Sequence, residues 1–566
     1  MRRYTRSIIL FSATAMLFSA CSKMPDHAKY IPKDAIAVAG LNLKSLSKKI
    51  AWNVITGSKL FKEMQARIPQ KGGKDAVNDI ENSGIDVYNT FYVYVKSDVR
   101  SKGSSRITGL VPLSDAGQWE AYVKKVFPTA VITQHGDRKE ASLSSSMYVA
   151  WDMHLMIMIN VLNSPDDYDA PSAQPAGPVD MSAEMDNAFT IQKDNSVTTD
   201  KHFNTLAMEE HDISFWLNYD QLMSQYMTSS MAQHMNGVSL SNTLWKNAAF
   251  TVGFDFVKGR ITGEMKYYIP EGLKAMGVEF GTTNVDKDML ARLPSQNMDM
   301  LMAAHISPKG VKAALDTMGL LGLANAGLST QGLDVDHVLD AFTGDMAIQM
   351  NDFGLHVETL KDSFMGQTVV HQKQKPSMSM SYALKINKKE DFQKLVDLAK
   401  QNGLMAMTVP MSNGFAVPLD DRDSIYILIN DQYVVASNKY PYAFGFLGNA
   451  YTGQKLPEAI SSQFTGNPSA FYFDIQGMLK NIDPNISHSA YDSAVIVNSK
   501  KLLNNISLSG GGYKDNSFSY HLDINFMNTE ENSIIDIMDY AMKINDARQA
   551  KDSLERAALK AANFSF

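Results

Sequence analysis

Four stretches of this 566-residue chain share one pattern, and this repetition constrains the fold more than any other feature of the sequence. Each contains an entry turn, a short apolar strand, a small polar residue and the start of a helix. The stretches are IPKDAIAVAGLNLKSL from Ile31, HDISFWLNYDQLM from His211, NMDMLMAAHISPKGV from Asn297 and NPSAFYFDIQGMLK from Asn467. The polar positions are Asn42, Asn218, Ser307 and Asp474, and such side chains cap free N–H groups at helix starts. The pattern predicts four strand-to-helix junctions.

The order of the stretches indicates a duplication. FWLNYDQLM aligns without gaps on FYFDIQGML, and each leads into two alternating strands, within 248–270 and 505–526. Segments 104–126 and 377–400 each predict a strand followed by an amphipathic helix. Segments 147–160 and 425–438 each predict two strands, hinged near Asp152 and near Asp431. Chance alternation of strands and helices is the alternative explanation.

We therefore expect an α+β fold with two sequence-similar units, 31–275 and 285–530, each a mostly antiparallel sheet with packed helices. A polar helical run within 531–566 predicts a C-terminal helix, which either packs on the second unit or binds a partner. The proline-rich segment 163–178 predicts a surface loop within the first unit.

The N-terminus has the layout of an export signal. Arg2, Arg3 and Arg6 precede a 14-residue apolar run, Ser7–Ala20, which is shorter than the roughly 20 residues that a membrane-spanning helix needs. Cys21, the only cysteine, follows directly and cannot form an internal disulfide. We expect a signal peptide at 1–20 and an anchor and tether at 21–30. The alternatives are a cleaved signal with an incidental cysteine, or an uncleaved anchor.

This arrangement resembles the lipobox of bacterial lipoproteins, although Phe18 stands where an aliphatic residue is usual. The resemblance implies diacylglyceryl transfer to the Cys21 thiol, cleavage before it and acylation, commonly with palmitate, of the new amino group. Several acyl chains anchor a protein durably where one does not. Ser22, not aspartate, directly follows Cys21, and no acidic run comes after it, so we expect a location at the outer membrane, facing the periplasm.

Composition excludes some classes of function. The formal net charge of −7 argues against binding to a nucleic-acid backbone, which requires clustered Lys and Arg. A hydrophobic content of 45% excludes wholesale disorder. No apolar run of about 20 residues follows Cys21, so the lipid is the expected membrane attachment.

Motifs for catalysis or cofactor binding are mostly missing, and we predict no catalytic, cofactor-binding or metal-binding residue. Ser45–Lys48 fits S-x-x-K but lacks the K-T-G strand that accompanies it in penicillin-binding enzymes. Asp334, Asp336 and Asp340 suggest a calcium loop, but Leu339 stands where the loop needs glycine, so a capped helix is the better interpretation. Met298, Met300 and Met302 are predicted to share a strand face, where core packing is favoured over Cu(I) binding.

The lipobox, the early segment IPKDA-x-x-V-x-x-L-N-L-K-S-L and the repeated strand–helix units resemble an uncharacterised Bacteroidota lipoprotein family, domain of unknown function 4836. That family implies no activity, and no site residue beyond Cys21. Two functions remain open. One is a non-enzymatic, lipid-anchored binding or scaffolding module for an envelope protein or glycan. The alternative is a periplasmic hydrolase acting on glycan or peptide, for which two carboxyls about 5–10 Å apart and flanked by aromatics would be the sign.

Overall fold

The structure is a computed structural model that describes residues 24–50, 82–97, 105–144, 146–162, 180–226, 245–364, 367–419, 423–451, 456–482 and 489–563. The predicted signal peptide 1–20, Cys21 and the proline-rich loop 163–178 lie outside the described residues. The chain divides into two compact units. Unit 1 is Met1–Lys48, Pro69–Gln221 and Thr251–Gly253, and unit 2 is Lys49–Ile68, Leu222–Phe250 and Phe254–Phe566.

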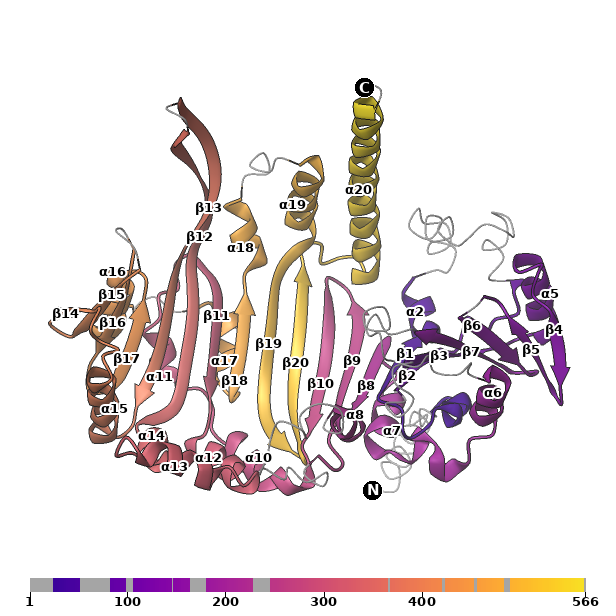
Figure 1. The fold of residues 1–566 in the computed structure, drawn as a ribbon, viewed down its shortest axis with the longest axis horizontal. Coiled ribbons are helices and arrows are strands. Elements are labelled where there is room, and N and C mark those ends of the chain that lie inside the picture. Colours follow the sequence, from indigo (N-terminus) through magenta and orange to yellow (C-terminus); the bar gives the residue numbers. More distant parts are fainter. Residues whose placement is uncertain are drawn as a thin grey trace, which may run out of the picture. The chain divides into compact units, whose positions relative to one another are not determined.

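Unit 1 contains an antiparallel sheet in the order β8-β1-β2-β3-β7-β6-β5-β4 (Figure 1). Its strands are β1 (Ala37–Asn42), β2 (Thr90–Ser97), β3 (Ser105–Pro112), β4 (Ile132–His135), β5 (Arg138–Ser142), β6 (Met147–Trp151), β7 (Leu155–Leu162) and β8 (Ile213–Asn218). The helices that accompany them are η1 (Asp26–Tyr30), α2 (Leu43–Lys49), α5 (Ala116–Val126), α6 (Met181–Phe189), η5 (Lys193–Asn195), η6 (Val197–Thr199), α7 (Lys201–Met208) and α8 (Tyr219–Tyr226).

Unit 2 contains the antiparallel order β10-β20-β19-β18-β11-β12-β13-β17-β16-β15-β14, and β9 pairs with β10. The strands are β9 (Ala249–Val257), β10 (Arg260–Tyr268), β11 (Met298–His305), β12 (Phe342–Phe364), β13 (Gln367–Ile386), β14 (Val409–Met411), β15 (Gly414–Pro418), β16 (Ser424–Ile429), β17 (Tyr433–Ser437), β18 (Ser469–Phe473), β19 (Leu503–Lys514) and β20 (Ser517–Phe526). β9 crosses the boundary between the units.

The helices of unit 2 lie at both ends of its strands, over one face, and over part of the other face where α15 packs. They are η8 (Glu271–Leu273), α10 (Lys274–Phe280), α11 (Lys287–Ala291), α12 (Pro308–Thr317), α13 (Leu321–Ser329), α14 (Val335–Asp340), α15 (Lys389–Gln401), α16 (Tyr440–Leu447), α17 (Glu458–Phe464), α18 (Ile475–Lys480), α19 (Ala490–Leu502) and α20 (Ser533–Asn563). In Figure 1, α10 and α12–α14 lie at one end of the strands, and α18 and α19 lie at the other. The α+β fold and the C-terminal helix are therefore confirmed, with α20 as that helix.

The two halves of the chain repeat one strand topology. The order β8-β1-β2-β3-β7-β6-β5-β4 in unit 1 has the same connectivity as β18-β11-β12-β13-β17-β16-β15-β14 in unit 2. The compact units nevertheless divide the chain elsewhere than the predicted repeat boundaries, 31–275 and 285–530. The reason is that β10 pairs along its whole length with β20, from Arg260↔Asn525 to Tyr268↔Ser517, and so belongs to unit 2.

All four predicted strand-to-helix junctions are confirmed. The side-chain oxygen of Asn42 accepts a hydrogen bond from the N–H of Ser45 at 3.0 Å. The other three junctions form the same bond to the residue three positions on: Asn218 to Gln221 at 3.1 Å, Ser307 to Gly310 at 3.2 Å and Asp474 to Gly477 at 2.7 Å. Each cap satisfies one of the N–H groups that a helix start leaves without an intrahelical partner.

Each unit buries one face of its sheet beneath several helices, and one further helix covers part of the other face: α5 packs on Val149 in unit 1, and α15 packs on Val434 in unit 2. In unit 1, Val38, Tyr92 and Trp216 are packed together with side chains from η1, α6 and α7. In unit 2, Leu301 and Tyr472 are packed together with side chains from α11, α16 and α17. Because successive side chains of a strand point to opposite faces, the residues between these buried ones form a second face.

Candidate functional site: an open apolar sheet face

The second face of the unit 2 sheet carries rows of apolar side chains that cross seven strands. Strand register fixes each row, because directly paired residues point to the same side. The central row is Gly263, Leu522, Leu508, Phe471, Met302, Ile348 and Tyr382, from β10 to β13. One flanking row is Ile261, Ile524, Ile506, Phe473, Met300, Met350 and Met380, and the other is Met265, Tyr520, Gly510, Ser469, Ala304, Met346 and Leu384. We call these three rows the open face.

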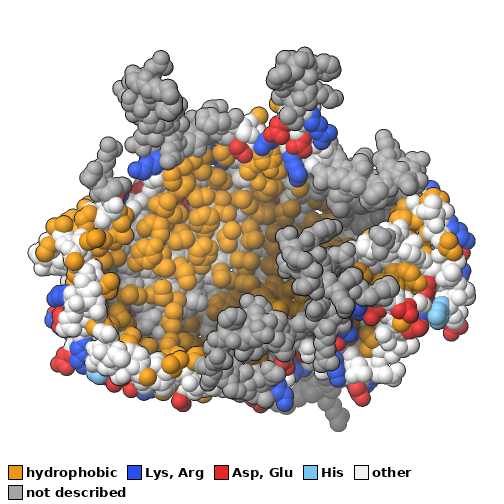
Figure 2. Space-filling model, in the orientation of Figure 1, with side chains coloured by type: hydrophobic (Ala, Val, Ile, Leu, Met, Phe, Trp, Pro, Cys, Tyr) orange, Lys and Arg blue, Asp and Glu red, His pale blue; other side chains and the backbone are white. Residues whose placement is uncertain are grey.

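The open face is accessible at its centre. Met302 is 39% exposed and Tyr382 is 46% exposed, whereas the neighbouring Leu301 and Ala303 of β11 are fully buried. Figure 2 shows hydrophobic side chains gathered over this part of the sheet. The three rows contain no Lys, Arg, Asp or Glu. An apolar patch of this continuity on a folded protein marks an interaction surface.

The other side of the same strands is polar where β10 and β20 pair. His521 Nδ1 lies 2.6 Å from Glu264 Oε1, and its Nε2 lies 3.1 Å from Asp523 Oδ2. Burial lowers the pKa of His521, but the carboxylates of Glu264 and Asp523 outweigh that effect and raise it above its ordinary value. Glu264 and His521 are about half exposed, at 51% and 43% of their side chains. The β10–β20 part of the sheet thus presents polar side chains on one side and the apolar open face on the other.

Helices border the open face. At one strand end, Ile475 and Leu479 of α18 pack on Phe473 and Ile506 of the flanking row. At the other end, Tyr513 of β19 pairs with Phe518 of β20, and both lie on the open side. The ring of Tyr513 contacts α10 at Gly277, where an added Cβ atom would lie only 2.6 Å from the ring. Toward β17, α15 packs on Val434 and Ile429. Helices α18, α10 and α15 therefore border the open face at its two strand ends and toward β17.

The prediction that Met298, Met300 and Met302 share one face is wrong for Met298. A register shift between Met298 and Met300 inserts Asp299 as a bulge, which returns Met298 to the buried face at 8% exposure. The carboxylate of Asp299 accepts a hydrogen bond from the N–H of Phe353 at 2.8 Å. Core packing holds for Met298, while Met302 lies in the open row.

Unit 1 carries a cluster of polar side chains between β5 and α6. Arg138 donates to Glu140 Oε1 at 2.7 Å through Nε and to Asp186 Oδ1 at 2.5 Å through Nη2. Tyr148 and Ser182 both donate to Glu140 Oε2, at 2.7 and 3.1 Å. Glu140 is 1% exposed and Arg138 is 9% exposed. No sequence motif indicates this cluster, because its members are up to 48 residues apart.

The chemistry of the cluster does not favour hydrolysis. Burial would raise the pKa of Glu140, but hydrogen bonds from Tyr148, Arg138 and Ser182 outweigh it and lower the pKa below its ordinary value. The hydrogen bond from Arg138 likewise lowers the pKa of Asp186. Both carboxyls are therefore ionised at neutral pH, whereas a glycosidase pair needs one protonated acid. Ser182 Oγ also lies 3.4 Å from Nδ1 of the exposed His135, but a hydroxyl has one proton to donate and its shorter contact, at 3.1 Å, is with Glu140. We therefore interpret the cluster as a structural ion-pair network.

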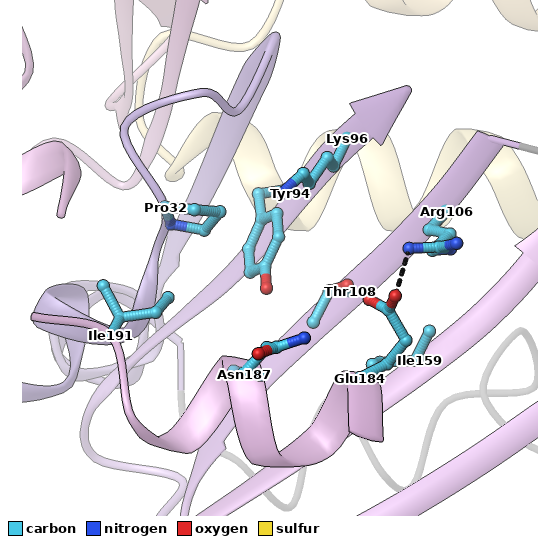
Figure 3. Close-up of a pocket in the computed structure, with 10 residues that line it drawn as sticks. Pro32, Tyr94, Lys96, Arg106, Thr108, Ile159, Glu184, Asn187 and Ile191 are labelled. Carbon is cyan, nitrogen blue, oxygen red and sulfur yellow. Dashed lines mark ion pairs between the residues drawn. The ribbon is translucent and has the colours of Figure 1, made fainter. Parts of the chain in front are cut away.

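A pocket of about 80 Å³ lies between the sheet of unit 1 and α6 (Figure 3). Arg106 and Glu184 lie side by side on its lining and form an ion pair with an N–O distance of 2.7 Å. Lys96, also on the lining, pairs with Asp34 at 2.9 Å. Tyr94 is buried, and burial raises its pKa to about 12, so its hydroxyl stays protonated. Because the cations are already neutralised, the pocket has little charge to offer a ligand.

The remaining sequence candidates have structural roles. Asp334 caps α14 by accepting from the N–H of His337 at 2.8 Å, and Asp336 and Asp340 pair with Lys312 and Lys388. The capped-helix interpretation is therefore confirmed. Ser45 lies in α2 beside its cap. Within the described ranges, no group of three His, Cys, Asp or Glu side chains is placed to hold a metal ion. In that same part of the chain, no helix combines the length and apolarity needed to cross a bilayer.

Comparisons with known proteins give little guidance. No protein-family model matches the chain, and no curated protein matches it. Among solved structures, crystal forms III and I of TP0453 align at 10% identity with a TM-score of 0.24. The alignments cover 44% and 47% of this chain and 81% and 82% of the other. A likeness of this size carries no argument, and the resemblance to the uncharacterised Bacteroidota lipoprotein family stays a prediction.

Proposed function

We propose that this protein is a lipid-anchored, non-enzymatic binding module of the cell envelope, and that the open face of unit 2 is its binding surface. The observation that supports the proposal is the charge-free central row with Met302 and Tyr382 exposed. Folded domains bury an apolar sheet face against a second layer, and the centre of this face remains accessible. A binding partner supplies the missing layer.

The anchor places the binding surface beside a membrane. The lipobox-like sequence ending at Cys21 supports acylation, and the location that we propose is the periplasmic side of the outer membrane. Cys21→Ala tests this part. The variant should move from the membrane pellet to the soluble fraction of detergent-free lysates, and mass spectrometry of the native protein should find acyl groups on Cys21. Unchanged sedimentation, or a bare cysteine, would remove the anchor from the proposal.

Site-specific photocrosslinking in cells tests the binding surface. A benzophenone amino acid at Tyr382 should yield adducts of defined mass, because that side chain is exposed on the open face. The matched control carries the same probe at Glu264, which is exposed on the polar side and should yield none. Either a lipid or a protein adduct at Tyr382 supports a binding role. Absence of adducts, or equal adducts at both positions, would rule it out.

A further inference from the structure

We infer that the occupant of the open face is the acyl chains of a membrane phospholipid, an inference that rests on the binding role proposed above. The chemistry of the face is the first argument. Protein interfaces carry about one hydrogen bond per 100–200 Å². The three rows offer few hydrogen-bonding side chains, Ser469 and the two tyrosines Tyr382 and Tyr520, and no charge. A ligand made of hydrocarbon matches such a surface because it leaves no polar group without a partner.

The dimensions of the face suit acyl chains. Seven strands spaced about 4.8 Å apart span about 29 Å, and three rows that lie two residues apart span about 14 Å along the strands. An acyl chain spans half of a hydrocarbon core of about 30 Å, which is about 15 Å. Several chains can therefore lie side by side on this face.

The residue types also suit a flexible occupant. Met300, Met302, Met346 and Met380 stand on three adjacent strands of the open face. Methionine side chains are unbranched and polarizable, so they repack around ligands of varying shape. Lipid chains have no fixed conformation and need a surface of this kind.

A second copy of the chain fits the open face poorly. Two packed sheets lie about 10 Å apart. Helices α18 and α10 stand on the open side, and a helix with its side chains is about 10 Å thick. A second copy that packed its sheet face to face would have to fit its own α18 and α10 into the same layer. Loose acyl chains carry no such elements.

Lipid transfer from vesicles tests the inference. The protein is the mature chain with Cys21→Ala, so that no anchor chains contribute, and the probe is pyrene-acyl phosphatidylcholine in phosphatidylcholine vesicles. The vesicles are then removed by flotation. The protein that carries only Cys21→Ala should hold the probe in the fraction that remains. Met302→Asp should lower capture by about tenfold or more, because a carboxylate would have to lose its water beneath hydrocarbon. Tyr382→Asp should lower lipid capture to a similar extent. This second variant keeps the test decisive if Met302→Asp fails to fold.

Ser519→Asp is the matched control, since Ser519 adjoins Tyr520 on β20 but points to the polar side. It should capture lipid as the wild-type surface does. The inference is overturned if the wild-type surface captures no lipid, if Ser519→Asp loses as much as Met302→Asp, or if sedimentation equilibrium finds a dimer that Met302→Asp dissociates. A crosslink from Tyr382 to protein alone would also overturn it while leaving the binding role standing.

Discussion

The open face of unit 2 has a counterpart in unit 1 that is built from smaller side chains. In unit 1 the corresponding row on β8, β1, β2 and β3 is Phe215, Ala39, Val93 and Gly109. In unit 2 it is Phe471, Met302, Ile348 and Tyr382. The covered faces, by contrast, keep large aromatics at aligned positions, Trp216 and Tyr472. The repeats therefore keep large side chains on the covered face, which packs the core. On the open row the side chains are larger in unit 2 than in unit 1, as expected if unit 2 binds the ligand.

Layer contacts also differ between the repeats. Unit 1 joins β5 to α6 through the Arg138–Glu140–Asp186 network. In unit 2 the helix after β17 is α16, and its Tyr440 packs edge-on against Tyr426 of β16 with ring centroids 5.5 Å apart. The helix that follows the β6–β7 hairpin is thus joined to its sheet by ion pairs and Tyr148 in unit 1, and the helix that follows β16–β17 is joined by a tyrosine pair in unit 2. This difference supports a structural role for the ionic cluster.

The largest effect should come from the covered face of unit 1. Trp216→Ala should lower the free energy of unfolding by about 3–5 kcal/mol, because it leaves a cavity under α7. The adjacent Phe215→Ala, on the open side, should cost much less. Urea unfolding monitored by circular dichroism measures both. Equal losses would mean that the two faces are equally packed and would break the comparison.

The ionic cluster should give the next effect. Glu140→Ala should cost about 3 kcal/mol, because Arg138 then loses one of its two carboxylate partners in a buried position. Thermal unfolding at pH 7 checks this prediction. A neutral result would show that the cluster contributes no more than a surface pair.

The same cluster should make unit 1 sensitive to acid. The folded-state pKa of Glu140 is lowered, so its stabilisation is present above the unfolded-state value of about 4.3 and is lost as pH falls through the lower folded value. Unfolding midpoints measured from pH 6 to pH 2 should fall less steeply for Glu140→Gln than for the wild-type chain. Parallel curves would place the acid sensitivity elsewhere.

The helix caps should contribute a smaller and equal amount in both repeats. Asp474→Ala and Asn218→Ala should each cost about 1 kcal/mol, since each removes one acceptor for an N–H at a helix start. Denaturant titrations of the two variants measure this. A loss in one repeat only would show that the junctions are not equivalent.

The smallest effect on stability should come from a substitution in the central row of the open face. Met302→Ala, which gives β11 the residue that β1 has at Ala39, should change the unfolding free energy by less than about 1 kcal/mol and yet lower lipid capture. Calorimetry and the vesicle assay check the two parts. A large loss of stability would indicate that Met302 packs as a core residue.

Local signals in the sequence predicted much of the fold. The four caps, the two hairpins of the β9–β10 and β19–β20 type and the strand–helix order follow from side chains a few residues apart. The turn residues Asp515 and Asn516 have positive φ values of 49° and 62°, as the turn prediction implies. The pairing of β10 with β20 could not be predicted, because it joins residues more than 200 positions apart and no local pattern encodes it.

The candidate site was harder to predict. Alternation along β11 shows that two faces exist, but which face the helices cover depends on tertiary packing. The bulge at Asp299 shifts the alternation, so period-2 reasoning placed Met298 on the wrong side. The Arg138 cluster has no spacing signal, because its ion pairs form between β5 and a helix 48 residues away.

Methionine oxidation compares the two faces of one strand and tests the central claim most directly. The delipidated chain, treated briefly with hydrogen peroxide, should form sulfoxide at Met302 much faster than at Met298, because Met302 is exposed and Met298 is buried. Phosphatidylcholine vesicles should protect Met302 and leave Met298 unchanged. Slow oxidation of Met302 without lipid, or oxidation that lipid does not alter, would contradict the account.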